Sequence, residues 1–315
     1  MHEFEPLPTP VLHSLTAEDG WLLRVWDFSP LPRRDPIAIV VVGHAMMVDS
    51  RTLCRPDRPT LTSVLVAAGF RVLVPDLRGH GESGPLAAQG GQWSDDDIVR
   101  DVGRYVALAR SLEPELPLAL LGHSLFGHAA LAWLGQHADA AGREVEALIA
   151  VACDIWNRRF EPSRPIWWFK RALHALALAL VLFVGYMPAR RLRLGTADES
   201  LGYFRQFHQW ITSNRWTDRS SMIDYHAGLA AIRCPFLHVL SEGDRLYARP
   251  TSALRMSAPI STREVVVLGR DDAPGELARL RPDHVQTLTD PRNKLAWHWI
   301  AGWLRRKLAP DAEAS

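Results

Sequence analysis

The chain has 315 residues, a formal net charge of +1 at pH 7, 23% charged residues and 47% hydrophobic residues. This length suffices for one large domain with an insertion, or for two domains, and the near-neutral charge gives no general reason to expect a nucleic-acid partner. Three widely spaced cysteines fit neither a disulfide framework nor a C-x-x-C metal site. The first residues carry no basic run followed by an apolar run. We therefore expect free thiols and a cytoplasmic protein.

The first third of the chain predicts a strand-rich start. Residues 11–28 contain two strand-like runs around Asp19-Gly20, a dipeptide that favours a tight hairpin turn. Residues 37–43 form a continuous β-branched run, typical of a strand that is covered on both faces. A helix is predicted over residues 61–68 and another buried strand over 71–75.

Strands and helices continue to alternate further along. Ser94 and the three aspartates after it are suited to begin a helix that runs to about Leu112. Buried strands are predicted at 118–121 and 147–152. The alternation stops from Ile155 to Ile232 and resumes with strands at 236–240 and 264–268 and a final helix at 292–307. Such alternation predicts a mostly parallel sheet with helices on both faces, interrupted by a mainly helical insertion.

The segment Gly122-His-Ser-Leu-Phe-Gly127 lies between a predicted strand and a predicted helix. Strand, tight turn and helix form the setting of a nucleophile elbow, in which Ser124 is lifted above the sheet. The usual pattern is G-x-S-x-G, but here Phe126 occupies the fifth position and the glycine follows one residue later. This departure leaves open how closely strand and helix approach, and the alternative is a serine that only caps the helix.

Three other segments, together with the elbow, resemble the α/β-hydrolase superfamily with a cap domain. Residues 76–83 are similar to its D-x-R-G-x-G-x-S loop, residues 240–247 follow a strand where the family carries its acid, and residues 282–291 resemble its catalytic-histidine segment. The resemblance runs from about residue 38 to 308. It implies an α/β-hydrolase core at 1–154 and 233–315 and a cap at 155–232.

The resemblance implies a catalytic triad in the order serine, acid, histidine. Ser124 would be the nucleophile, Asp244 the acid and His284 the base. Asp154, directly after the preceding strand, is the rival acid, and Glu242 is a weaker one.

The resemblance also places the oxyanion donors. The amide of Leu125 follows the nucleophile, and the amide of Met46 lies in the loop after strand 37–43. We expect His44 to brace this loop rather than transfer protons. The positions expected at the substrate are His44, Ala45, His123, Phe126 and Trp156.

The predicted cap is basic and contains a long apolar run. Residues 155–195 hold eight arginines or lysines against one acid, Glu161. The run at 167–187 is interrupted early by charged residues, so a transmembrane span is not favoured. Three interpretations stay open: a helix packed on the core, the lining of a pocket for a lipophilic acyl chain, and an interfacial helix on anionic lipid. The basic residues themselves have two interpretations. They form either a contact for a phosphate or carboxylate group of the substrate or a face that is only solvated.

The sequence therefore predicts a serine hydrolase that cleaves a carboxylic ester with a hydrophobic acyl or alcohol part, without metal or organic cofactor. Thioesterase, lactonase, peptidase and acyltransferase activities use the same residues and stay open. A catalytically silent fold that binds a lipophilic ligand is the alternative from another class. The expected partner is a small lipophilic ester, with no nucleic acid and with peripheral membrane contact through the cap as a further interpretation.

Overall fold

The computed structural model describes residues 6–30, 32–138 and 144–309. Its central sheet has eight strands in the order β1-β2-β4-β3-β5-β6-β9-β10. The strands are β1 (Val11–Thr16), β2 (Leu22–Phe28), β3 (Ala38–Gly43), β4 (Phe70–Asp76), β5 (Leu118–His123), β6 (Ala147–Val151), β9 (Phe236–Ser241) and β10 (Arg263–Leu268). The pairings β1–β2 and β2–β4 are antiparallel, and the other pairs in this sheet are parallel. The predicted fold class is confirmed.

The continuous apolar strands are explained by cover on both faces. In β3, Ile39 and Val41 belong to one hydrophobic cluster, whereas Ala38, Val40 and Val42 belong to another on the opposite face. Successive side chains of a strand point to opposite faces, so an unbroken apolar run is needed when both faces are buried.

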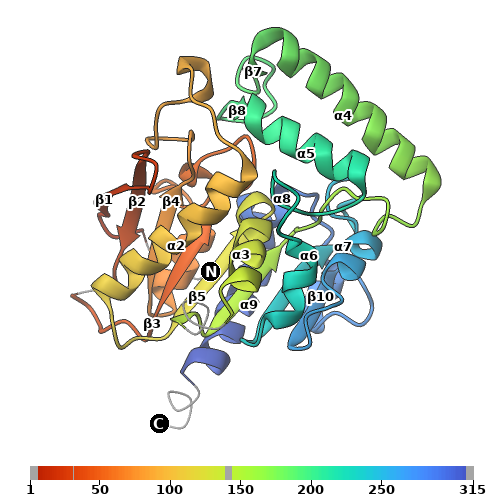
Figure 1. Ribbon diagram of the computed structural model, residues 1–315. Coiled ribbons are helices and arrows are strands. Elements are labelled where there is room, and N and C mark those ends of the chain that lie inside the picture. The colour runs from red at the N-terminus through yellow and green to blue at the C-terminus, as the bar shows by residue number, and fades with distance from the viewer. Residues whose placement is uncertain (1–5, 31, 139–143, 310–315) are drawn as a thin grey trace.

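Helices α2 and α3 cover one face of the sheet, and α1 and α9 cover the other (Figure 1). The helices of the described chain are α1 (Leu61–Ala67), α2 (Asp95–Leu112), α3 (Leu125–Gln136), α4 (Arg164–Val184), α5 (Leu201–Ser213), α6 (Tyr225–Gly228), α7 (Pro250–Met256), α8 (Gln286–Thr289) and α9 (Lys294–Leu308). The predicted start of α2 is confirmed: Ser94 forms a capping box with Asp97, whose carboxylate accepts hydrogen bonds from the Ser94 amide and hydroxyl.

The segment between β6 and β9 is mainly helical. Helices α4 and α5 lie side by side beyond the end of the sheet, next to the small strand pair β7 (Tyr186–Met187) and β8 (Glu199–Ser200) (Figure 1). The last part of the segment packs on the core instead, because α6 meets α3 where Gly228 and Gly135 face each other. The boundaries 155–232 for a cap stay an interpretation, since α6 contacts the core as closely as a core helix.

Candidate active site

Ser124 lies at the turn between β5 and α3 in a conformation that few residues adopt. Its φ is 48° and its ψ is −102°, and its amide donates to the carbonyl of Val151 on the neighbouring strand. A non-glycine residue with positive φ stores strain and is typical of functional sites. The side chain thereby stands at the carboxyl end of the parallel strands.

The close approach of strand and helix does occur, through Gly122 and Gly127. A Cβ added at Gly122 would lie 2.3 Å from the Gly127 amide nitrogen, and one added at Gly127 would lie 3.0 Å from the Gly122 carbonyl oxygen. The glycine one position later than the usual pattern therefore makes the tight contact. Phe126, in the usual glycine position, points into the core, where its ring lies over Gly43 and 6.2 Å from the ring of Tyr105.

Three predicted residues from distant parts of the chain form one hydrogen-bonded series. The Nε2 atom of His284 lies 3.1 Å from the Ser124 hydroxyl, and its Nδ1 lies 2.6 Å from Oδ2 of Asp244. Asp244 follows β9 and His284 follows β10, so the carboxyl ends of neighbouring parallel strands bring them together. This is the geometry that a serine needs to transfer its proton to a histidine oriented by a carboxylate.

The Asp244 carboxylate is buried but well supplied with donors. It accepts the amides of Tyr247 and Ala248, each at 2.9 Å, in addition to His284. Burial by itself would raise the pKa of Asp244, but these hydrogen bonds outweigh it and the pKa is lowered. The group is therefore ionised at neutral pH.

The two rival acids have other partners. Asp154 lies 3.7 Å from the Lys170 ammonium in a buried cluster, where burial raises its pKa to about 7. Glu242 accepts a hydrogen bond from Arg270 at 2.6 Å. Of the three candidates, Asp244 is the one that contacts His284.

Two further rings surround His284. The His123 Nε2–H donates to the backbone carbonyl of His284 at 2.9 Å, and the two imidazoles lie 5.5 Å apart. The Tyr247 ring lies 5.0 Å from His284 on another side. Tyr247 was missed in the sequence, although its place three residues after Asp244 is a usable signal.

The predicted oxyanion loop is braced as expected. His44 is buried, its Nε2 accepts the Leu77 amide and its Nδ1–H donates to the Ala45 carbonyl. Burial, followed by the neighbouring His80, lowers the pKa of His44 to about 4, so the ring is neutral and holds one tautomer. This arrangement suits a loop support and not a proton carrier.

The turn in the predicted oxyanion loop is held by β8, from the segment between β6 and β9. Met47 has a φ of 62°; its amide donates to Glu199 of β8 at 3.4 Å, and its carbonyl accepts the Ala197 amide. The Met47 amide is thus engaged, while Met46 is the turn residue before it and Leu125 is the first residue of α3. The predicted donor Leu125 directly follows Ser124, whereas Met46 lies in the loop after β3, and the role of both amides stays a prediction.

Glu199 is a buried carboxylate that was not among the residues predicted from the sequence. It also accepts the Trp93 indole N–H at 2.8 Å and lies 3.2 Å from Nε2 of His80. The other ring nitrogen of His80 faces the Arg78 carbonyl, so both nitrogens meet acceptors. Burial opposes protonation, but Glu199 outweighs it and raises the pKa of His80. The pair links β8 to the D-x-R-G-x-G-x-S loop.

Several predicted substrate contacts have a different environment from the one expected. The side chains of His44, His123 and Phe126 are buried and in contact with protein groups, which makes them supports of the site and not its wall. Ala45 is buried in the oxyanion loop. Trp156 is also buried: its indole donates to the Tyr247 carbonyl, and the two rings stack 6.0 Å apart.

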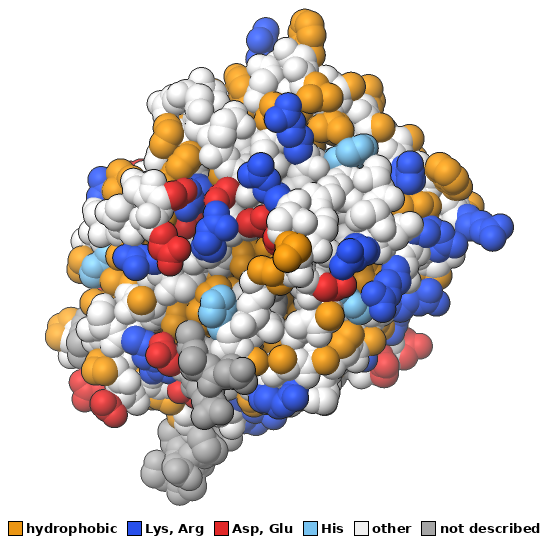
Figure 2. Space-filling view, viewed as in Figure 1, with side chains coloured by type: hydrophobic (Ala, Val, Ile, Leu, Met, Phe, Trp, Pro, Cys, Tyr) orange, Lys and Arg blue, Asp and Glu red, His pale blue; other side chains and the backbone are white. Residues whose placement is uncertain are grey.

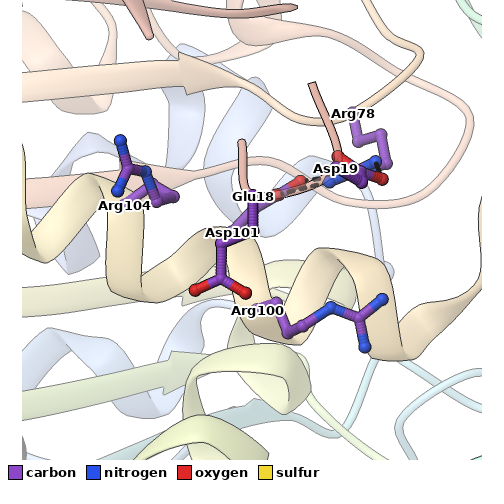
Figure 3. Close-up of a pocket in the computed structure, with 6 residues that line it drawn as sticks. All are labelled: Glu18, Asp19, Arg78, Arg100, Asp101 and Arg104. Atoms are coloured by element: carbon purple, nitrogen blue, oxygen red, sulfur yellow. Dashed lines mark hydrogen bonds and ion pairs between the residues drawn. The ribbon is translucent and has the colours of Figure 1, made fainter. Parts of the chain in front are cut away.

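A surface pocket of about 210 Å³ elsewhere is formed by charged residues of the first hairpin and α2 (Figure 3). Arg78, from the loop after β4, also lines it and pairs with Asp101 at 2.7 Å and with Asp19 at 2.5 Å. No triad residue lines it. Arg78 thus connects the loop after β4 to α2 and to the first hairpin. Among residues 6–30, 32–138 and 144–309, no group of three His, Cys, Asp or Glu is arranged to hold a metal ion.

The fold and the strand-end serine, histidine and aspartate define an α/β-hydrolase. Residues 34–267 match the model of the family described as serine aminopeptidase, S33, and the chain belongs to this family. No curated protein sequence matches the chain significantly.

Solved structures share the fold at low sequence identity. An esterase from Pyrococcus furiosus is 15% identical with a TM-score of 0.60, over 95% of this chain and 91% of that one. Est1E from Butyrivibrio proteoclasticus, solved with ferulic acid, is 12% identical with a TM-score of 0.62, over 94% and 99%. An esterase from Exiguobacterium antarcticum is 18% identical with a TM-score of 0.58, over 94% and 100%.

Proposed function

We propose that this protein is a serine esterase that cleaves carboxylic esters with a hydrophobic acyl or alcohol part. The observation that carries the proposal is the series Ser124–His284–Asp244, with distances of 3.1 and 2.6 Å. Esterases among the structures of the same fold agree with it.

In the proposed mechanism, His284 takes the hydroxyl proton through Nε2 as Ser124 attacks the ester carbonyl carbon. Asp244 holds the Nδ1–H and stabilises the imidazolium. The amides of Leu125 and Met46 stabilise the oxyanion. His284 returns the proton to the leaving alcohol, and a water that it then activates hydrolyses the acyl-enzyme.

The preference for a lipophilic substrate rests on the aromatic surroundings of the triad. Tyr247 lies beside His284 and stacks on Trp156, which in turn forms a hydrophobic cluster with Trp167 and Ile211. Aromatic groups on this side of the histidine favour an apolar substrate part over a charged one. We propose a cytoplasmic location, with which the three free cysteines agree.

A second candidate is peptide-bond cleavage, which the description of the matched family favours. The same triad serves both reactions, so only the leaving group distinguishes them. Aminoacyl p-nitroanilides, tested beside p-nitrophenyl esters, separate the two: a higher kcat/KM on the anilides would replace the esterase proposal.

The decisive experiment compares wild type and Ser124→Ala on p-nitrophenyl esters from acetate to palmitate. We expect wild-type turnover with an optimum above acetate and a loss of about a thousandfold or more in the variant, with the melting temperature nearly unchanged. A serine-directed fluorophosphonate should label wild type only. If wild type neither turns over an ester nor reacts with the phosphonate, the protein is a silent member of the fold and the proposal fails.

A further inference from the structure

Helix α4 has its polar and apolar faces reversed with respect to an ordinary surface helix. Lys170 and His174 point inward and are buried, together with Trp167 and Val181. The exposed residues of the helix after Arg164 are apolar: Pro165, Trp168, Phe169, Ala172, Ala175, Leu176, Ala179, Leu182, Phe183 and Val184. A helix of a soluble protein normally places its charges outward.

The exposed residues form one continuous stripe, which we call the α4 stripe. Their spacing of three or four residues places them on one side of the helix, over a length of about 30 Å. The large side chains are strongly exposed, with 63% for Trp168, 72% for Leu176 and 91% for Phe183. Contiguous apolar surface of this kind marks a binding face.

The other side of α4 is attached to the protein. Among the described residues, α4 is the one helix long and apolar enough to cross a membrane by length and composition. However, its inner face packs on α5, and the Lys170 ammonium lies 3.3 Å from Glu161 and 3.7 Å from Asp154. A helix held in this way presents one side to its surroundings and is suited to lie in an interface, not to span it.

Positive charge stands at both ends of the stripe. Arg164 begins the helix, and the Arg171 guanidinium lies 5.4 Å from the ring of exposed Trp168. Beyond the other end, the loop of residues 190–194 contains three exposed arginines and two exposed leucines. Residues 162–195 contain no aspartate or glutamate. Figure 2 shows exposed hydrophobic side chains along the upper right edge, where α4 lies in Figure 1, with basic side chains near its ends.

We propose that the α4 stripe and the 190–194 loop dock this protein on an anionic lipid bilayer. The helix lies parallel to the surface, its apolar side chains enter the acyl boundary, and the arginines contact lipid phosphates. A second copy of the chain fits the face less well. Because both ends of the stripe are basic, either relative orientation of two copies brings like charges together.

Docking in this way sets the proposed active site close to lipid, a consequence that rests on the proposed function. The inner face of α4 contributes Trp167 to the cluster with Trp156, and Trp156 stacks on Tyr247, the neighbour of His284. Helix α4 is therefore connected to the Tyr247 ring, beside His284, through two aromatic contacts. This short connection favours a substrate that comes from the membrane.

The test is vesicle flotation with the full chain carrying Ser124→Ala, so that binding is measured without turnover. Vesicles of phosphatidylcholine alone are compared with vesicles containing about one third phosphatidylglycerol, at low and high salt. We expect flotation with the anionic vesicles, weakened by salt. The double variant Leu176→Ser/Phe183→Ser should abolish it, and Arg190→Gln/Arg191→Gln/Arg193→Gln should weaken it by about a hundredfold.

Matched controls alter equally exposed side chains elsewhere. Met222→Ser removes a side chain that is 86% exposed outside α4, and Arg55→Gln/Arg279→Gln/Arg292→Gln removes three exposed charges. Both should float like the parent. The proposal is overturned if the parent does not float with anionic vesicles, or if the α4 variants float as well as the controls. It is also overturned if Leu176→Ser/Phe183→Ser instead converts a dimer to a monomer. Soluble short-chain ester hydrolysis by the same variants with Ser124 restored reports separately on the proposed function.

Discussion

At the scale of single residues, the elbow depends on a pair of glycines. Gly122 and Gly127 are in backbone contact, while Phe126 fills the core over Gly43. The site tolerates a large residue at the fifth position of the motif because the Phe126 ring has room over Gly43, which lacks a side chain. Space is needed at the sixth position, where the helix passes the strand.

Gly122→Ala should therefore be damaging. Its Cβ would lie 2.3 Å from the Gly127 amide nitrogen, and backbone cannot move aside cheaply. We expect a loss of about 1–3 kcal/mol in the free energy of unfolding and a larger loss of esterase activity, because Ser124 is displaced. Gly302→Ala in α9 is the control: its Cβ would lie 3.4 Å from the flexible end of Arg306, and it should be neutral or stabilising. Equal stability of the two variants in urea unfolding would refute the contact.

The identity of the acid is a second question at this scale. Asp244→Asn should lower kcat by about a thousandfold or more, because an amide no longer stabilises the His284 imidazolium. Asp154→Asn should stay within about tenfold of wild type, since Asp154 faces Lys170 and not His284. Steady-state kinetics on one ester check both, and the reverse order would move the acid to the earlier strand.

At the scale of elements, α4 is attached to the core through a buried ionic cluster. Lys170 reaches Asp154 after β6 and Glu161 before α4, and Glu161 also pairs with Arg249 ahead of α7. The Lys170 ammonium also lies 5.3 Å from the Trp156 ring. Three charged side chains with no exposure hold the helix over the site, which explains why its polar residues face inward.

Lys170→Met tests this attachment. The substitution keeps the length of the side chain but leaves buried Asp154 without its cation and Glu161 with Arg249 alone, which should cost about 3–5 kcal/mol of unfolding free energy. Urea unfolding measures the loss. Arg171→Met is the control, because Arg171 is the next basic residue along the helix and its guanidinium lies over Trp168 at the surface. This variant should change the free energy of unfolding by less than about 1 kcal/mol. A stable Lys170→Met protein would show that packing alone holds α4.

At the scale of the whole molecule, the two hydrophobic clusters enclose several histidines in neutral form. Burial lowers the pKa of His123 and His128 to about 3 and that of His44 and His238 to about 4. An unfolded histidine titrates near about 6.5. Below that pH these histidines bind protons in the unfolded chain but stay neutral in the folded chain. Their contribution therefore lowers the stability of the fold as the pH falls. His174 and His226 also have lowered pKa values and act in the same direction. The pKa values of His80, Asp95, Asp101 and Asp154 are raised, and these four groups act in the opposite direction, against six histidines.

The protein should therefore lose stability as the pH falls from about 6.5 to about 4, because the buried histidines outnumber the groups with raised pKa values. Each buried neutral histidine contributes a slope of up to about 1.4 kcal/mol per pH unit in this window. His128→Leu should make the slope shallower by about one proton, because His128 is shifted by burial alone, between Trp210 and Trp216. Urea unfolding at pH 5, 6 and 7 measures the slopes. An unchanged slope in the variant would mean that His128 is accessible to protons.

By itself the sequence determined the alternation of elements, the elbow at Ser124 and the order serine, acid, histidine. These features depend on local patterns: apolar runs of buried strands, turn glycines and loops at predicted strand ends. The parallel arrangement then brought Asp244 and His284 to one edge, so the candidate triad was predictable.

Only the tertiary structure decided which side of each segment faces the core. The apolar sequence of α4 does not indicate whether the helix is buried or exposed. The Lys170 side chain points inward because Asp154 and Glu161, from other parts of the fold, contact its ammonium group. Likewise, Glu199 acquires its position beside Met47 through a contact across 152 residues, and Phe126 finds its place over a glycine on another strand. Such contacts join residues far apart in the chain, and no local pattern encodes them.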